Sequence, residues 1–237
     1  MWNKNKKVNF DLFVNNYNKL LKKKTSFFSS HEYFSDYKVR LAIENLNISS
    51  LKKIRILEYG CGIGRNIKYL KKYFKNFSIE LSACDVSIKS LNFLKRLFPS
   101  VKCFDCSGRD YIYNHLEKYD IIFIAGVFHH ISPKERHNVS RNISSMLKND
   151  GQLIIFEHNP FNPITRKIVK ECEYDEDAIL LTPKKLISYF SKIKKMKLKE
   201  KKYYLFIPQK FRFLNFIEKY LSWFPIGGQY FLVFNKK

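Results

Sequence analysis

An apolar strand that runs into three alternating glycines is the feature that most constrains this fold. It is the segment ILEYGCGIGRN, residues 56–66. Gly60 permits a tight strand-to-helix turn, Gly62 lets a ligand approach bare backbone, and Gly64 lets the helix pack on the strand. The segment therefore predicts a nucleotide-sized pocket at the end of a strand.

Short apolar runs alternate with helical patterns from residue 54 onward, which is typical of a parallel sheet covered by helices on both sides. Five strands are expected at 54–59, 78–84, 100–104, 119–125 and 151–157. Helices are expected at 63–74, 87–97, 133–147, 162–172 and 183–193. Two further strands, in 197–207 and 229–235, flank a helical aromatic stretch at 211–223. The prediction is an α/β, doubly wound, mostly parallel seven-stranded Rossmann-like sheet with an antiparallel last strand.

The residues before the glycine motif predict an N-terminal helical cap over residues 1–50, ahead of a main domain over 51–237. Its helices are expected at 8–23 and 35–47. Three aromatic side chains of the cap either close over the pocket or pack on the sheet: Tyr17, Phe34 and Tyr37. We expect cap and main domain to form one compact unit.

Ligands of such sheets bind at the carboxyl ends of the strands, where the strand order reverses. The residues expected to line this crevice are Glu58, Gly60, Asp85, Gly126, Val127, Glu157 and His158. Asp85 ends the second strand, where a carboxylate can accept hydrogen bonds from both ribose hydroxyls of a nucleoside. The alternative is that Asp85 only caps the next helix.

The glycine pattern separates two cofactors that share this ribose contact. A dinucleotide fingerprint requires a glycine at position 65, where this chain has Arg65, and the third glycine is Gly64 instead. S-adenosylmethionine has no pyrophosphate, so the helix N-terminus would receive its carboxylate. Glu58 would suit its ammonium group. The sequence therefore favours S-adenosylmethionine over NAD.

Four segments together resemble the class I S-adenosylmethionine-dependent methyltransferases, in particular the small-molecule branch that includes ubiquinone-biosynthesis-type enzymes. They are ILEYGCGIG, ACDVS, KYDIIFIAGVFHHISPKE and LKNDGQLIIFEHNP. The resemblance also implies that residues 159–182 form a lid over the pocket. It implies these cofactor contacts: Glu58, Gly60, Cys61, Gly62, Gly64, Asp85, Val86, Gly126 and Val127. The chain departs from the family at Ser107, where an acidic residue commonly meets the adenine, so that contact is left unassigned.

Two histidines directly after the fourth strand are the candidate catalytic residues. His129 and His130 would face the crevice, and Glu157 at the end of the fifth strand could orient one of them. A positioned general base contributes roughly 10²–10⁴-fold when the acceptor is a hydroxyl, although methyl transfer does not require one. The alternative is that either histidine only satisfies backbone groups of the loop.

Composition bounds the partners and the compartment. The formal net charge of +23 raises nucleic acid or an anionic membrane as a partner, but a lysine-rich composition alone gives the same surplus. The longest apolar run, 121–128, is too short to cross a bilayer, and no secretory signal is evident. Five cysteines without a disulfide pattern, of which Cys103 and Cys106 lack further zinc ligands, predict a cytoplasmic protein without a metal.

We expect the protein to transfer a methyl group from S-adenosylmethionine to a small-molecule acceptor, by O-methylation in sugar, lipid, quinone or secondary biosynthesis. The alternatives are an RNA methyltransferase that exploits the positive charge, and a catalytically inactive cofactor-binding scaffold. The sequence does not indicate the acceptor, the methylated atom or the oligomeric state.

Overall fold

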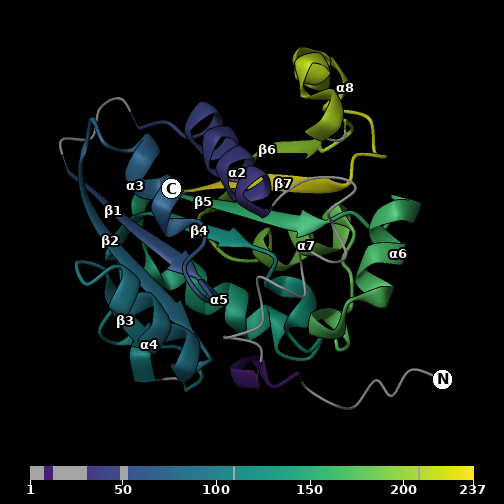
Figure 1. Cartoon of the computed structure of the whole chain (residues 1–237). Helices are drawn as coiled ribbons and strands as arrows, with labels where there is room; N and C mark the ends of the chain where they lie inside the picture. The colour runs from purple at the N-terminus through teal and green to yellow at the C-terminus, as the bar shows by residue number, and fades with distance from the viewer. Residues whose placement is uncertain (1–7, 13–30, 49–52, 109, 208) are drawn as a thin grey trace.

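The computed structural model describes residues 8–12, 31–48, 53–108, 110–207 and 209–237 (Figure 1). Seven strands in this part of the chain form one sheet in the order β3-β2-β1-β4-β5-β7-β6. Their bounds are β1 Lys53–Tyr59, β2 Ser78–Asp85, β3 Lys102–Asp105, β4 Tyr119–Ala125, β5 Leu147–His158, β6 Met196–Tyr204 and β7 Gln229–Lys236. The first five strands are parallel, and β7 runs antiparallel between β5 and β6. This confirms the predicted fold class.

Helices cover both faces of the sheet (Figure 1). Their bounds are α2 His31–Asn45, α3 Ile67–Tyr73, α4 Ile88–Leu97, α5 Arg136–Met146, α6 Pro163–Glu171, α7 Pro183–Phe190 and α8 Glu218–Leu221. Short 3-10 helices are η1 Phe10–Leu12, η2 Asp110–Ile112, η3 Phe128–His130, η4 Glu173–Asp175 and η5 Gln209–Ile217. One core cluster contains side chains of α2, α3 and α4, and the other contains side chains of α5 and α7.

Burial on both faces explains why the central strands read as continuous apolar runs. Ile121, Ile122, Phe123 and Ile124 of β4 are all at most 1% exposed, because they alternate between the two core clusters. The chain crosses from one side of β1 to the other when it passes from β3 to β4. This reversal places a crevice at the carboxyl ends of β1 and β4.

Several helix boundaries differ from the predicted ones for local reasons. The first helix of the main domain, α3, begins at Ile67 rather than residue 63, because Gly62 and Gly64 have positive φ angles that a right-handed helix excludes. α6 begins at Pro163, one residue after its predicted start, because Asn162 caps it and accepts from the Thr165 amide. α7 begins at Pro183 as predicted, directly after Thr182, which accepts from the Lys185 amide.

The predicted cap is only partly described. Its second helix is α2, whereas the first, predicted at 8–23, lies mostly outside the described residues, as does Tyr17; residues 10–12 form the single 3-10 turn η1. The buried Tyr37 hydroxyl donates to Glu218 of α8 at 2.6 Å, so this aromatic residue packs and anchors. Among the described residues, no helix has the length and apolar character needed to cross a membrane.

Candidate functional site

The glycine turn after β1 is built as its spacing predicts, with one difference. Gly60 has φ +71°, and a Cβ there would lie 2.4 Å from a methyl group of Val127, so only glycine fits. A Cβ on Gly62, at φ +50°, would meet no protein atom within 4 Å, so this position opens onto the crevice. Gly64 makes room for Leu94 of α4, a helix rather than the predicted strand.

Asp85 holds the turn from the neighbouring strand. One carboxylate oxygen accepts from the Gly62 amide at 2.7 Å, and the other accepts from the Ser87 amide at 2.9 Å. Burial raises the pKa of Asp85, and these backbone hydrogen bonds oppose the rise. The side chain that caps α4 is that of Ser87, so Asp85 is not simply the cap of this helix. Asp85 therefore lies beside the bare backbone of the glycine turn.

Glu58 is a buried carboxyl group with one oxygen available. Its Oε1 accepts from the Asn66 side chain at 2.7 Å, while its Oε2 has no hydrogen-bond partner among the described residues. Burial raises the pKa of Glu58 to about 8, although the Asn66 hydrogen bond lowers it. A buried carboxyl group with a raised pKa is suited to bind a cation, because a nearby positive charge would stabilise its ionised form.

Two cavities meet at the carboxyl ends of the strands. The first, of about 320 Å³, lies between α2 and residues 162–175 and reaches Cys61 and Gly62. The second, of about 240 Å³, is lined by Asp85, Val86 and Val127 together with Cys106, Ser107 and Gly108. Both cavities are lined by Gly60, Gly126, His130 and Tyr174. The structure thus brings most of the predicted site residues into one continuous crevice. Gly64, Glu58 and Glu157 are buried and do not line either cavity.

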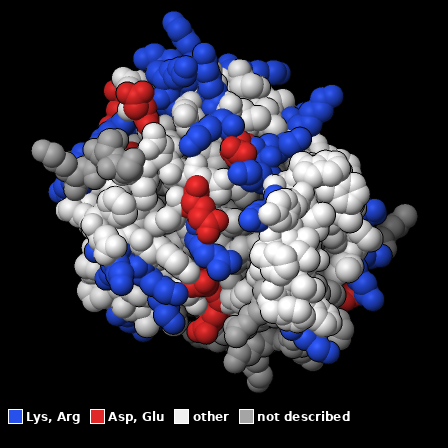
Figure 2. All heavy atoms as spheres, turned by 90° about the horizontal axis from the view of Figure 1, so that it is seen from above, with Lys and Arg blue, Asp and Glu red and all other residues white. Residues whose placement is uncertain are grey.

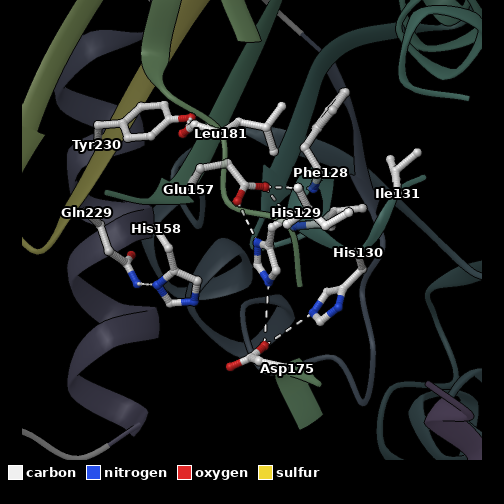
Figure 3. Close-up of polar contacts among 12 residues, drawn as sticks. Phe128, His129, His130, Ile131, Glu157, His158, Asp175, Leu181, Gln229 and Tyr230 are labelled. Atoms are coloured by element: carbon white, nitrogen blue, oxygen red, sulfur yellow. Dashed lines mark hydrogen bonds and ion pairs between the residues drawn. The ribbon is translucent and has the colours of Figure 1, made fainter. Parts of the chain in front are cut away.

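Glu157 and His129 form a buried pair beneath the crevice (Figure 3). One oxygen of Glu157 accepts from the amides of Val127 and Phe128, and the other accepts from Nδ1 of His129 at 2.6 Å. Burial lowers the pKa of His129, but Glu157 and Asp175 outweigh burial and raise it to about 10. In this environment His129 is protonated at neutral pH, which does not suit a general base.

Two aspartates between α6 and α7, Asp175 and Asp177, complete a cluster that the sequence did not predict. Nδ1 of His130 donates to Asp177 Oδ1 at 2.7 Å. Asp175 Oδ1 lies 3.6 Å from Nε2 of His129 and 3.4 Å from Nε2 of His130 (Figure 3). The neighbouring histidines hold the pKa of Asp175 well below its usual range, against the opposing effect of burial. The acidic run DED at 175–177 is the sequence feature that marks this cluster, but its partners, His129 and His130, lie more than 40 residues earlier in the chain.

His158 is the third histidine of the crevice, and its state is the opposite of that of His129. Burial and the neighbouring His129 together lower the pKa of His158 to about 4. The Tyr204 hydroxyl donates to the Gln229 carbonyl, and the Gln229 amide donates to Nδ1 of His158 at 3.3 Å. His158 is therefore neutral with its proton on Nε2.

The comparisons with known proteins agree with this geometry. Residues 56–151 match the model of a family described as a methyltransferase domain. This segment of the chain is a methyltransferase domain. It is also similar to tRNA N(3)-methylcytidine methyltransferase trm140 of Schizosaccharomyces pombe, with 32% identity over 108 residues. That match covers 43% of this chain and 35% of the relative, so the chain spans about a third of the length of that protein.

Solved structures share the fold of this chain over most of its length. A SAM-dependent methyltransferase from Archaeoglobus fulgidus has a TM-score of 0.65 at 16% identity, covering 93% of this chain and 100% of that one. A possible histamine N-methyltransferase from Thermotoga maritima has a TM-score of 0.65 at 16% identity, covering 100% and 99%. Geranyl diphosphate C-methyltransferase from Streptomyces coelicolor, in complex with S-adenosyl-L-homocysteine, has a TM-score of 0.61 at 11% identity, covering 85% and 76%. The predicted class I S-adenosylmethionine-dependent methyltransferase fold is confirmed.

Proposed function

We propose that the protein transfers a methyl group from S-adenosylmethionine to a small-molecule acceptor. The observation that carries the proposal is the pair of cavities that meet at Gly60, Gly126 and His130. One cavity has the groups that suit a nucleoside, and the other is a covered space of a size typical of small-ligand sites. Methyl transfer is an in-line displacement, so its main requirement is that cofactor and acceptor meet in alignment with water excluded.

The nucleoside half of the cofactor is placed in the second cavity. Asp85 would accept hydrogen bonds from the ribose hydroxyls, while Val86 and Val127 provide apolar surface for the adenine. The amino-acid half would pass over Gly60 and Gly62, where the available oxygen of Glu58 suits the ammonium group. The S-adenosyl-L-homocysteine in the Streptomyces coelicolor structure supports this cofactor.

The acceptor is placed in the first cavity, beneath the lid of residues 159–182. Lid side chains Ile164, Ile168 and Tyr174 line this cavity together with Phe34 of α2. Lys38 of α2 also lines it, and burial lowers the pKa of Lys38 to about 8. The mixture of apolar surface and a few polar groups favours an acceptor that carries a hydroxyl group.

Among the predicted catalytic residues, His130 is placed to contact the acceptor. It lines both cavities, whereas His129 lines the first and Glu157 lines neither. His129 and Glu157 are at most 2% exposed, and we assign them as positioning residues. Glu157 fixes the end of β4 through two amides and His129 through Nδ1. Because the leaving thioether is neutral, alignment contributes more than proton transfer.

A second candidate function is RNA methylation. The similarity to a tRNA methyltransferase and the net charge of +23 favour it. On the face shown in Figure 2, however, the lysine and arginine side chains gather in separate groups with acidic and uncharged residues between them. A basic patch or stripe would be expected for folded RNA, and this face does not show one. The first cavity supports the small-molecule acceptor, which we therefore prefer.

Transfer of labelled methyl groups distinguishes these functions. The purified protein is incubated with methyl-labelled S-adenosylmethionine and, separately, with total tRNA and with a low-mass and lipid extract of the same cells. We expect label in the low-mass or lipid fraction and none in precipitated RNA. Label in RNA, with binding that weakens steeply as salt rises, would establish the RNA function instead. Cofactor binding without transfer to either fraction would favour an inactive scaffold.

A further inference from the structure

We propose that His129, His130 and Asp175 form a binding site for a divalent transition-metal ion, with Zn²⁺ as the preferred ion. The three side chains come from the loop after β4 and from the lid, and they face one another beside the first cavity (Figure 3). Their candidate ligand atoms all lie within 4.8 Å of one another. Two imidazoles and one carboxylate are a ligand set that zinc commonly adopts when it keeps an open position.

The distances fit coordination better than hydrogen bonding. Asp175 Oδ1 lies 3.6 Å from Nε2 of His129 and 3.4 Å from Nε2 of His130. Both distances exceed the 2.7–3.2 Å range of an N–H to oxygen hydrogen bond. They match the edges of a tetrahedron around an ion, which are about 3.3–3.6 Å for ligands bound at about 2.0–2.2 Å.

The outer hydrogen bonds orient both imidazoles as ligands. Each Nδ1 donates to a carboxylate, His129 to Glu157 at 2.6 Å and His130 to Asp177 at 2.7 Å. A carboxylate can only accept, so each Nδ1 carries a proton, and a bound ion would take the place of any proton on Nε2. Metal-binding histidines almost always donate their second nitrogen in this way. Nε2 of His130 is buried and has no hydrogen-bond partner among the described residues.

Charge and access also favour a cation. Three carboxylates, Glu157, Asp175 and Asp177, contact two imidazoles in a cluster that has little exposure to solvent. A divalent ion would neutralise most of this negative charge. His130 also lines the second cavity, so the remaining coordination position lies near the junction where the acceptor would meet the cofactor.

The ion would change what the site can do to an acceptor hydroxyl. A Lewis acid would lower the pKa of a bound hydroxyl group and fix its oxygen in place, so that its proton could pass to solvent water and the methyl group could move to the oxygen as the neutral thioether leaves. This consequence rests on the proposed methyl transfer, but the metal site itself does not. It is therefore tested by binding, in the absence of cofactor and acceptor.

The test is titration of the chelator-treated protein with Zn²⁺ by calorimetry, and with Co²⁺ by visible absorption. We expect one ion per chain and a Co²⁺ spectrum typical of a mixed nitrogen and oxygen site. Asp175→Asn and His130→Ala should each weaken Zn²⁺ binding by more than about 100-fold, and Asp177→Asn should weaken it by about 10–100-fold because it only orients His130.

Two controls separate this site from incidental binding. The Cys103→Ser/Cys106→Ser variant removes the CxxC pair, and His137→Ala removes a histidine outside the cluster; both should bind Zn²⁺ as the parent does. Thermal unfolding of each variant checks its fold. No stoichiometric binding of Zn²⁺ or Co²⁺ by the parent protein, or equal affinity in a folded Asp175→Asn variant, would contradict the proposal and leave the cluster as an ion-paired network.

Discussion

Asp85 is the residue on which the cofactor placement depends most directly. Its carboxylate lies in the second cavity beside Gly62, and a charged hydrogen bond of this kind contributes about 1.5–3 kcal/mol. We expect Asp85→Ala to weaken S-adenosylhomocysteine binding by about 10–100-fold. Asp105→Ala is the matched control, because Asp105 lies opposite Asp85 in the sheet but, among the described residues, its carboxylate accepts hydrogen bonds from Ser107 alone. Equal affinities in the two variants would contradict the ribose assignment.

Glu58 gives the protein a specific pH dependence. Its pKa of about 8 in the folded state lies above its usual 4.5, so the folded protein retains a proton that the unfolded chain releases. The stabilisation is complete below pH 4.5 and is lost as the pH rises through 8, by at most about 1.4 kcal/mol per pH unit. We expect Glu58→Gln to be less sensitive to pH than the parent between pH 5.5 and 8.5 in denaturant unfolding. Parallel stability curves would show that Glu58 is ionised throughout.

Residues close to the motifs were predictable, and residues that depend on tertiary contacts were not. Gly60, Gly62 and Asp85 follow from one strand, one turn and one strand end, so their spacing places them. Asp175 and His158 were assigned no role or only a weak one, because their states depend on partners from other elements. The protonation of His129 depends on Asp175 as well as on Glu157, so its orientation was predictable from the sequence while its charge was not.

At the scale of elements, two glycines in the turn between β1 and α3 allow effects on stability to be told apart from effects on cofactor binding. Ala at Gly60 would place a methyl group 2.4 Å from Val127, whereas Ala at Gly62 would enter open space. Both positions have positive φ, which costs a non-glycine residue about 1–2 kcal/mol. We expect Gly62→Ala to keep its fold and lose cofactor affinity, and Gly60→Ala to be destabilised further. The measurements are thermal unfolding and S-adenosylhomocysteine affinity, and a folded Gly62→Ala variant with parental affinity would contradict the pocket placement.

The strands were easier to predict than the ends of helices. The buried runs of β1, β2 and β4 are bounded by charged or glycine residues, so their limits agree with the predictions to within one residue. β5 begins at Leu147 rather than residue 151, because Leu147 pairs with Tyr119 of β4, although the polar NDG that follows resembles a turn. The division into a cap over 1–50 and a domain over 51–237 stays a prediction, because residues 13–30 and 49–52 lie outside the described residues.

At the scale of the whole molecule, the alternation of strands and helices predicted the sheet. No comparable sequence pattern predicts which acceptor molecule binds. The first cavity is built jointly by α2, the lid and residues 205–207, which the chain brings together from three distant segments. Net charge is equally uninformative, because +23 describes the composition and not where the charges lie. Cytoplasmic residence and the small-molecule acceptor therefore stay predictions.

The central claim is that this crevice binds S-adenosylmethionine, and calorimetry on the purified full chain tests it most directly. S-adenosylmethionine, S-adenosylhomocysteine and NAD are titrated in parallel at neutral pH, with Asp85→Ala beside the parent. We predict that the first two bind one per chain, that Asp85→Ala weakens both, and that NAD does not bind. Binding of NAD in preference to the other two, or no binding of either S-adenosyl compound by the folded parent, would contradict the account.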